Sequence, residues 1–239
     1  TLAALDRYLD GGGALLALFG PGTPEPVRRW TRARYAVRQH DDVVISPTRG
    51  GALAGVGLRT VVVSEGYGEH PAVARLRTVL TTYPLTQTLR YAPVAGRDID
   101  GQILLLTPEG TWGETDPQTK YSGTPRYDAG ADRPGPKPFG VMLDVPRPDA
   151  AGSAAADADT ASAPPDPGRL IILGSSGVIT NRNLGLYGNR DLLLNLVGWL
   201  AAEEDLLGIR GRRASFQPLL LDGRTEDWLG AVSVLIWPG

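Results

Sequence analysis

The sequence predicts an α/β fold, with a mainly parallel sheet and helices on both faces. Short, continuously apolar segments such as 14–19 (ALLALF) and 103–107 (ILLLT) suit strands that are covered on both sides. Segments with helical periodicity lie between several of them. From Arg169 to Leu200 a buried strand, a Gly-Ser turn and an amphipathic helix follow one another. Such alternation favours parallel strands joined by crossover helices.

The N-terminal α/β portion is predicted to span residues 1–145. Its first helix carries Leu2, Leu5 and Leu9 on one stripe, and its second begins after Thr23 with Pro24 at the first position. The expected elements are a helix over 1–10, a strand over 14–19, a helix over 24–35, strands over 43–46 and 60–64, a short helix near 71, and strands over 85–91, 103–107 and 139–145.

A change of composition divides the chain. Residues 146–168 are rich in Ala, Asp, Pro and Ser and hold almost no large apolar side chain, so we expect a flexible linker or insertion there. Residues 169–239 then form a C-terminal α/β portion, which completes the same domain or makes a closely packed second one. Its expected elements are strands over 170–173, 216–221 and 232–237, and a helix over 189–203.

Composition excludes several classes of function. The 239 residues carry a formal net charge of −2, which gives no reason to expect nucleic-acid binding. The chain has no cysteine, which excludes thiol nucleophiles, disulfides and zinc-thiolate sites. No apolar run approaches the roughly 20 residues that a membrane-spanning helix needs. Both ends nevertheless read as if cut from something longer.

The turn at 174–177 (GSSG) is the first candidate site, because open α/β sheets bind ligands where strands end. Gly174, Ser175 and Ser176 are small enough to let backbone N–H groups approach a ligand. The turn lacks the GK[ST] of a phosphate loop. It is not a serine-nucleophile elbow either, because Leu173 stands where the first glycine belongs.

A catalytic reading of the same turn needs a base. His70, before Pro71, is the histidine that would serve Ser175 or Ser176 in a serine hydrolase. Without an elbow this remains an alternative, and we expect no enzyme activity. The chain has only two histidines, and neither has acidic residues at ligand spacing, so no metal or other cofactor is expected.

Polar residues near the predicted helix at 189 complete the expected binding site. Asn189 suits the helix N-cap, and together with Asn181, Asn183 and Arg190 it forms a polar rim beside Gly174. The ligand-binding prediction therefore comprises Gly174, Ser175, Ser176, Asn181, Asn189, Arg190 and His70. A further alternative is a carbohydrate-binding module that uses Trp112, Tyr121 and Tyr127 as stacking platforms.

The run 170–204 (LIILGSSGVITNRNLGLYGNRDLLLNLVGWLAAEE) resembles the C-terminal part of the GldG-like auxiliary components of bacterial ABC transporters. The match rests on a strand ending in Gly-Ser-Ser, then Gly-Asn-Arg-Asp, then a helix with an Asn and a Trp-Leu. Segments 5–19 (LDRYLDGGGALLALF), 70–71 (HP) and 111–114 (TWGE) are similar to further parts of that family.

The resemblance implies a domain related to flavodoxin-like and class I glutamine-amidotransferase-like folds. It also implies a non-catalytic binding or scaffolding role on the extracytoplasmic face of the inner membrane, in the bacterial cell envelope, with the parent protein anchored by transmembrane helices. The expected partners are the permease and ATPase subunits of the transporter, with a small molecule, a carbohydrate or a peptide as ligand.

Overall fold

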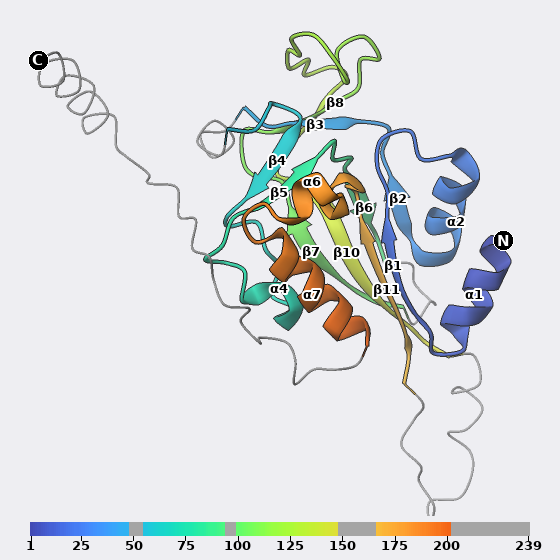
Figure 1. Cartoon of the computed structure of the whole chain (residues 1–239). Helices are drawn as coiled ribbons and strands as arrows, with labels where there is room; N and C mark the ends of the chain where they lie inside the picture. The colour runs from blue at the N-terminus through green and yellow to red at the C-terminus, as the bar shows by residue number, and fades with distance from the viewer. Residues whose placement is uncertain (48–54, 94–98, 148–165, 202–239) are drawn as a thin grey trace, which may run out of the picture.

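A four-stranded sheet forms the centre of the protein in a computed structural model that describes residues 1–47, 55–93, 99–147 and 166–201 (Figure 1). Its strand order is β1-β11-β10-β7, formed by β1 (Ala14–Leu18), β11 (Gly168–Leu173), β10 (Pro138–Val145) and β7 (Asp100–Leu106). Because β11 lies between β1 and β10, residues before and after the segment 148–165 build one sheet.

The directions of these strands contradict the predicted fold class. Only β1 and β11 run parallel, with Leu15 opposite Leu170. The central strand β10 is antiparallel both to β11 and to β7. The fold is therefore mixed and mostly antiparallel, and the expected flavodoxin-like or amidotransferase-like parallel sheet is wrong.

The error has a physical cause. A strand that is buried on both faces has a continuously apolar sequence whichever way it runs. In β10 the residues from Phe139 to Leu143 are all buried, because alternate side chains enter the cores on opposite sides of the sheet. Burial can be predicted from such a run, whereas strand direction cannot.

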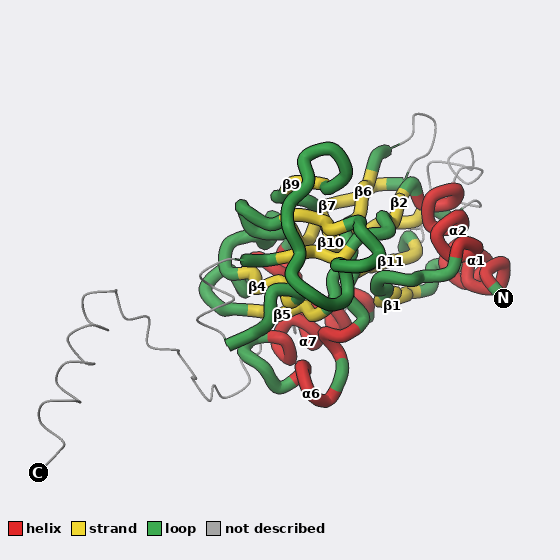
Figure 2. Tube along the Cα trace, turned by 90° about the horizontal axis from the view of Figure 1, so that it is seen from above, coloured by secondary structure: helices red, strands yellow, loops and turns green. Residues whose placement is uncertain are grey.

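Two helices cover one face of the sheet (Figures 1 and 2). They are α1 (Leu2–Asp10) and α2 (Glu25–Tyr35), and their apolar side chains join a core with Val141, Leu143 and Ile172. The Asp6 carboxylate links the two helices, since it accepts hydrogen bonds of 2.8 Å each from Trp30 Nε1 and Tyr35 OH.

The other face is covered by α7 (Asn189–Leu200), the short α4 (Pro71–Ala74) and the strand pair of β4 (Thr60–Val63) and β5 (Thr81–Pro84). Leu192, Leu196 and Trp199 of α7 are buried against this second core. At the end of α7, Arg169 Nη1 donates to the carbonyl of Trp199 at 2.5 Å, and its guanidinium lies 5.2 Å from the Trp199 ring.

Short strands complete the described structure. Antiparallel pairing joins β2 (Val37–Gln39) to β6 (Leu89–Tyr91), and joins β3 (Val43–Ile45) to β8 (Trp112–Glu114) and then β9 (Arg133–Pro134). The 3₁₀ helix η1 (Gly177–Ile179) and α6 (Asn181–Leu184) connect β11 to α7. The strand predicted over 85–91 is shorter than expected: β6 begins only at Leu89, and Leu85 has a φ of 46°, which is not an extended conformation.

Some expectations fall on residues outside the described ranges. These are most of the predicted insertion, residues 148–165, and the predicted strands over 216–221 and 232–237. Within the ranges that are described, every helix is too short or too polar to span a bilayer.

Candidate functional site: a strand-end turn and a basic groove

The strand-end turn, residues 174–177, follows β11 directly. Gly174 is held on both sides, since its N–H donates to the Phe139 carbonyl and its carbonyl accepts from the Gln87 N–H, each at 2.7 Å. A methyl group on Gly174 would clash with the carbonyl of Gln87. The glycine thus allows close approach of the backbone, and the partner is another segment of this chain.

The two serines of the turn have different environments. Ser175 is fully buried, and its hydroxyl donates to the carbonyl of Pro84 at 2.7 Å. Ser176 is exposed and lies beside the loop after β1, where a methyl on Gly20 would come within 3.2 Å of Ser176 Oγ. Ser175 therefore fixes the turn to the end of β5, and only Ser176 faces the surface.

His70 lies at a different level of the sheet. Its Nδ1 accepts a hydrogen bond of 3.2 Å from the N–H of Ala72, which caps α4, and its ring meets Trp199 edge-on at 5.4 Å. It borders a cavity of about 20 Å³, enough for a water molecule, together with Asp100, Gln102, Met142 and Asp144.

The register of β11 separates His70 from the serines. Met142, beside His70, is opposite Ile171, and Ser176 follows five residues later. From Ile171 to the end of β11 at Leu173 the strand covers roughly 7 Å at about 3.3 Å per residue, and the serines lie beyond it in the turn. The structure therefore does not bring together the serine–histidine pair that the hydrolase alternative requires.

Asn189 belongs to the protein's own hydrogen-bond network. Its side chain is fully buried and accepts from the Thr82 N–H at 2.8 Å. It also donates to the carbonyls of Thr82 at 3.0 Å and Asn183 at 2.8 Å. The amide thus meets the edge of β5 as a residue of a neighbouring strand would. Asn181 and Arg190, the other members of the predicted rim, are exposed on α6 and α7.

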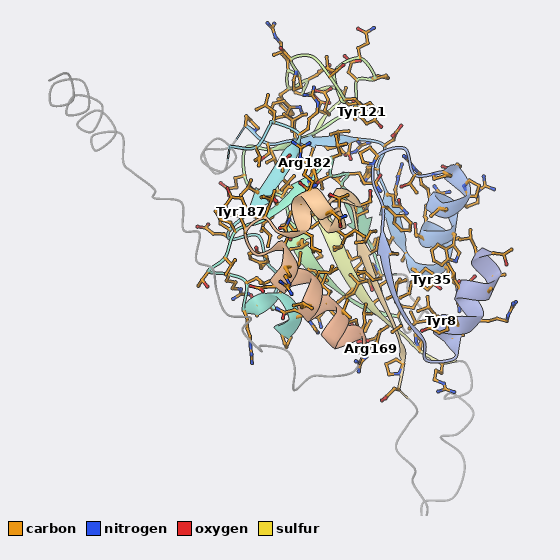
Figure 3. All side chains as sticks on the ribbon, viewed as in Figure 1. Tyr8, Tyr35, Tyr121, Arg169, Arg182 and Tyr187 are labelled. Carbon is orange, nitrogen blue, oxygen red and sulfur yellow. The ribbon has the colours of Figure 1, made fainter. Side chains whose placement is uncertain are left out.

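The aromatic residues of the carbohydrate alternative do not form a flat platform. The rings of Trp112 and Tyr127 are 6.0 Å apart at 65°, an edge-to-face arrangement. Tyr121 and Tyr127 are each 48% exposed. Tyr121, labelled in Figure 3, lies in the loop after β8, which Arg59 holds by donating to four of its carbonyl oxygens.

A larger hollow, the basic groove, lies between β6 and the segment that runs from β9 into β10. Its volume is about 470 Å³, within the range of small-molecule sites. The lining residues are His40, Thr88, Leu89, Arg90, Tyr91, Asp132, Arg133, Pro134, Lys137 and Pro138. None of them was predicted from the sequence as a site residue.

Buried acids fix one wall of this groove. Asp42 is fully buried and accepts from the Thr88 N–H at 2.8 Å and the Thr88 hydroxyl at 2.6 Å, and its Oδ2 lies 3.5 Å from Arg133 Nη1. Asp132 accepts from the backbone N–H groups of Thr115, at 3.1 Å, and Asp128, at 2.8 Å. Both carboxylates are thus engaged in holding loops to the sheet.

Unlike these acids, two of the cations in the groove have no charged partner among the described residues. The structure pairs neither Arg90 nor Lys137 with a carboxylate among the described residues, whereas Arg133 contacts Asp42. Burial, and then the charge of Arg133, lower the pKa of the His40 imidazole below its ordinary 6.5, although the Asp42 carboxylate acts in the opposite direction. At neutral pH His40 therefore presents an uncharged ring to the groove.

Among the described residues, no three His, Asp or Glu side chains are grouped so that they could hold a metal ion. Two arginines of α2 are paired with acids, since Arg28 lies 3.2 Å from Asp41 and Arg34 pairs with Asp10.

Comparison with known proteins identifies a similar fold. The chain resembles a solved structure named as the mmIFT52 N-terminal domain. The TM-score is 0.53 and the identity 16%, over 83% of this chain and 69% of that one. At this identity the likeness concerns the fold alone, and it agrees with the correction of the fold class made above. No family model matches the chain, and no curated protein does.

Proposed function

We propose that this chain is a non-catalytic binding domain that takes a ligand in the basic groove. The groove itself carries the proposal: a hollow of about 470 Å³ with polar, charged and apolar walls. Sites for small molecules commonly combine apolar walls with a few placed polar groups. The groups that a hydrolase would use, Ser175 and His70, instead serve the turn and the start of α4.

The setting in which this domain works is part of the same proposal. The resemblance of residues 170–204 to GldG-like proteins supports an auxiliary subunit of a bacterial ABC transporter, acting on the extracytoplasmic face of the inner membrane. Its partners would be the permease and ATPase subunits, and the domain would present its ligand to them or hold them together.

The transporter setting is tested with the full-length gene product, tagged and expressed in its own bacterium. Membranes are separated from cytosol, and the tagged protein is cross-linked, purified and analysed by mass spectrometry. We expect recovery in the membrane fraction, together with one ATPase and one permease. Recovery in the cytosol alone, without either subunit, would contradict the proposal.

A further inference from the structure

Four cationic side chains meet around the basic groove, although the chain as a whole carries a formal charge of −2. Arg90, Arg133 and Lys137 line it, and Arg38 stands directly opposite Arg90 in the pairing of β2 with β6. Residues opposite each other in an antiparallel pair project from the same face. Arg38 and Arg90 are thus two exposed arginines on the same face of this strand pair.

Such a pair is unfavourable without a neutralising partner, because like charges directly opposite each other on a sheet repel. In the described ranges no carboxylate lies within ion-pair distance of Arg38, Arg90 or Lys137. The two nearby acids are already engaged: Asp42 with Thr88 and Arg133, and Asp132 with backbone N–H groups. The groove therefore keeps a positive excess that a bound anion would relieve.

The chemistry of the donors specifies the kind of anion. A guanidinium offers a planar set of N–H donors that matches two oxygens of one carboxylate or phosphate, and an ammonium adds a point charge. Arg90 and Lys137 supply one of each.

The remaining walls indicate that the ligand also has an organic part. Leu89, Tyr91, Pro134 and Pro138 line the groove beside the cations and offer apolar contact. The volume of about 470 Å³ exceeds what a bare inorganic ion would fill.

We propose that the basic groove binds a small organic oxyanion, with its carboxylate or phosphate between Arg90 and Lys137 and its carbon skeleton against Tyr91 and the two prolines. This inference names the ligand class for the proposed binding function and rests on it. The carboxylate and phosphate alternatives share the same recognition chemistry, and the experiment separates them.

The test uses isothermal titration calorimetry on the purified 239-residue chain at low ionic strength. The probes are citrate, glucose 6-phosphate and uncharged glucose. We expect saturable binding of at least one anion and none of glucose. Citrate alone would identify a carboxylate site, and glucose 6-phosphate alone would identify a phosphate site.

Substitutions tie the binding to the groove. Arg90→Gln and Lys137→Gln should each weaken the bound anion about tenfold or more, because each removes a charged hydrogen-bond donor. Arg182→Gln is the matched control, since it makes the same charge change at an exposed position of α6 (labelled in Figure 3) that does not line the groove. Unchanged melting temperatures verify that all three variants fold.

Three outcomes would overturn the inference: no saturable binding of either anion, equal weakening by Arg182→Gln, or tight binding of glucose that survives Arg90→Gln. The last result would show a binding domain with a neutral ligand. It would agree with the proposed binding function and contradict the proposed ligand class. Failure of the membrane recovery experiment would instead remove the transporter setting and leave anion binding untouched.

Discussion

Asn189 joins α7 to β5 through a single amide that serves three backbone groups. Replacing it with alanine would leave the buried N–H and carbonyl of Thr82 without this partner. We predict that Asn189→Ala lowers the free energy of unfolding by about 2–4 kcal/mol, measured by urea denaturation. Asn181→Ala, at an exposed position on α6, should change it by less than about 0.5 kcal/mol. Equal effects would refute the structural role of Asn189.

His40 makes stability depend on pH in the acid range. Its pKa in the folded protein lies below the ordinary 6.5, so between these two values the unfolded chain binds more protons than the folded one. Stability must therefore fall as the pH drops from 6.5 toward the lowered value, and this loss is absent above 6.5.

We predict that the wild type loses more stability than His40→Gln between pH 7.5 and pH 5.5. The difference should be at most about 1 kcal/mol, because the imidazole is only half-buried and solvent screens its charge. Urea unfolding of both proteins at the two pH values measures it. An identical loss in the variant would show that other groups cause the acid sensitivity.

At the scale of elements, the end of β11 depends on a glycine. The backbone of Gly174 is hydrogen-bonded to Phe139 on one side and Gln87 on the other, which leaves no freedom to move away from an added methyl group. We predict that Gly174→Ala destabilises the protein by about 2–4 kcal/mol.

Gly185→Ala provides the control for this prediction. Gly185, after α6, has a φ of −83° and no neighbouring atom within 4 Å of a new methyl group. The substitution should leave the melting temperature unchanged or raise it slightly, since alanine restricts the unfolded chain. A comparable loss in both variants would mean that close packing is not what Gly174 provides.

The elements also show how far the sequence could predict the fold. The apolar runs of β1, β10 and β11 and the leucine stripe of α1 are local patterns, and each was placed within a few residues. Strand direction depends on connections, which a buried run does not encode. The short strands β2 (VRQ) and β5 (TTYP) have too few residues to show a period, so they were missed.

The candidate site was harder to predict for the same reason. The turn after β11 was located correctly. Asn189 was expected as the N-cap, but it is the first residue of α7, and its pairing with Thr82 could not be predicted because the two residues are 107 positions apart. Arg90 and Lys137 are each isolated in the sequence. Only the pairing of β6 with β2, and the position of β10 beside β6, gather them around one groove.

Across the whole molecule, we expect local stability against opening to be highest at the centre of the main sheet and to decrease toward the edges of the structure. β11 is hydrogen-bonded on both sides and almost entirely buried, whereas β9 has two partly or fully exposed residues at the rim of its sheet. We predict that the amides of β11 exchange with deuterium most slowly, and that the Arg133 N–H, which is the single amide of β9 because Pro134 has none, exchanges among the fastest, as followed by NMR. Faster exchange in β11 than in β9 would contradict this order.

The place of β11 between β1 and β10 also governs when the protein can fold. Leu15 is synthesised early, but it cannot pair in the sheet until its partner Leu170 has also been synthesised. At ribosomal rates of about 5–20 residues per second, this interval is on the order of ten seconds or more. Throughout it the apolar strand β1 has no neighbour to pair with. The nascent chain is consequently most vulnerable to aggregation before β11 emerges, and that risk is set by topology rather than by the finished protein's stability.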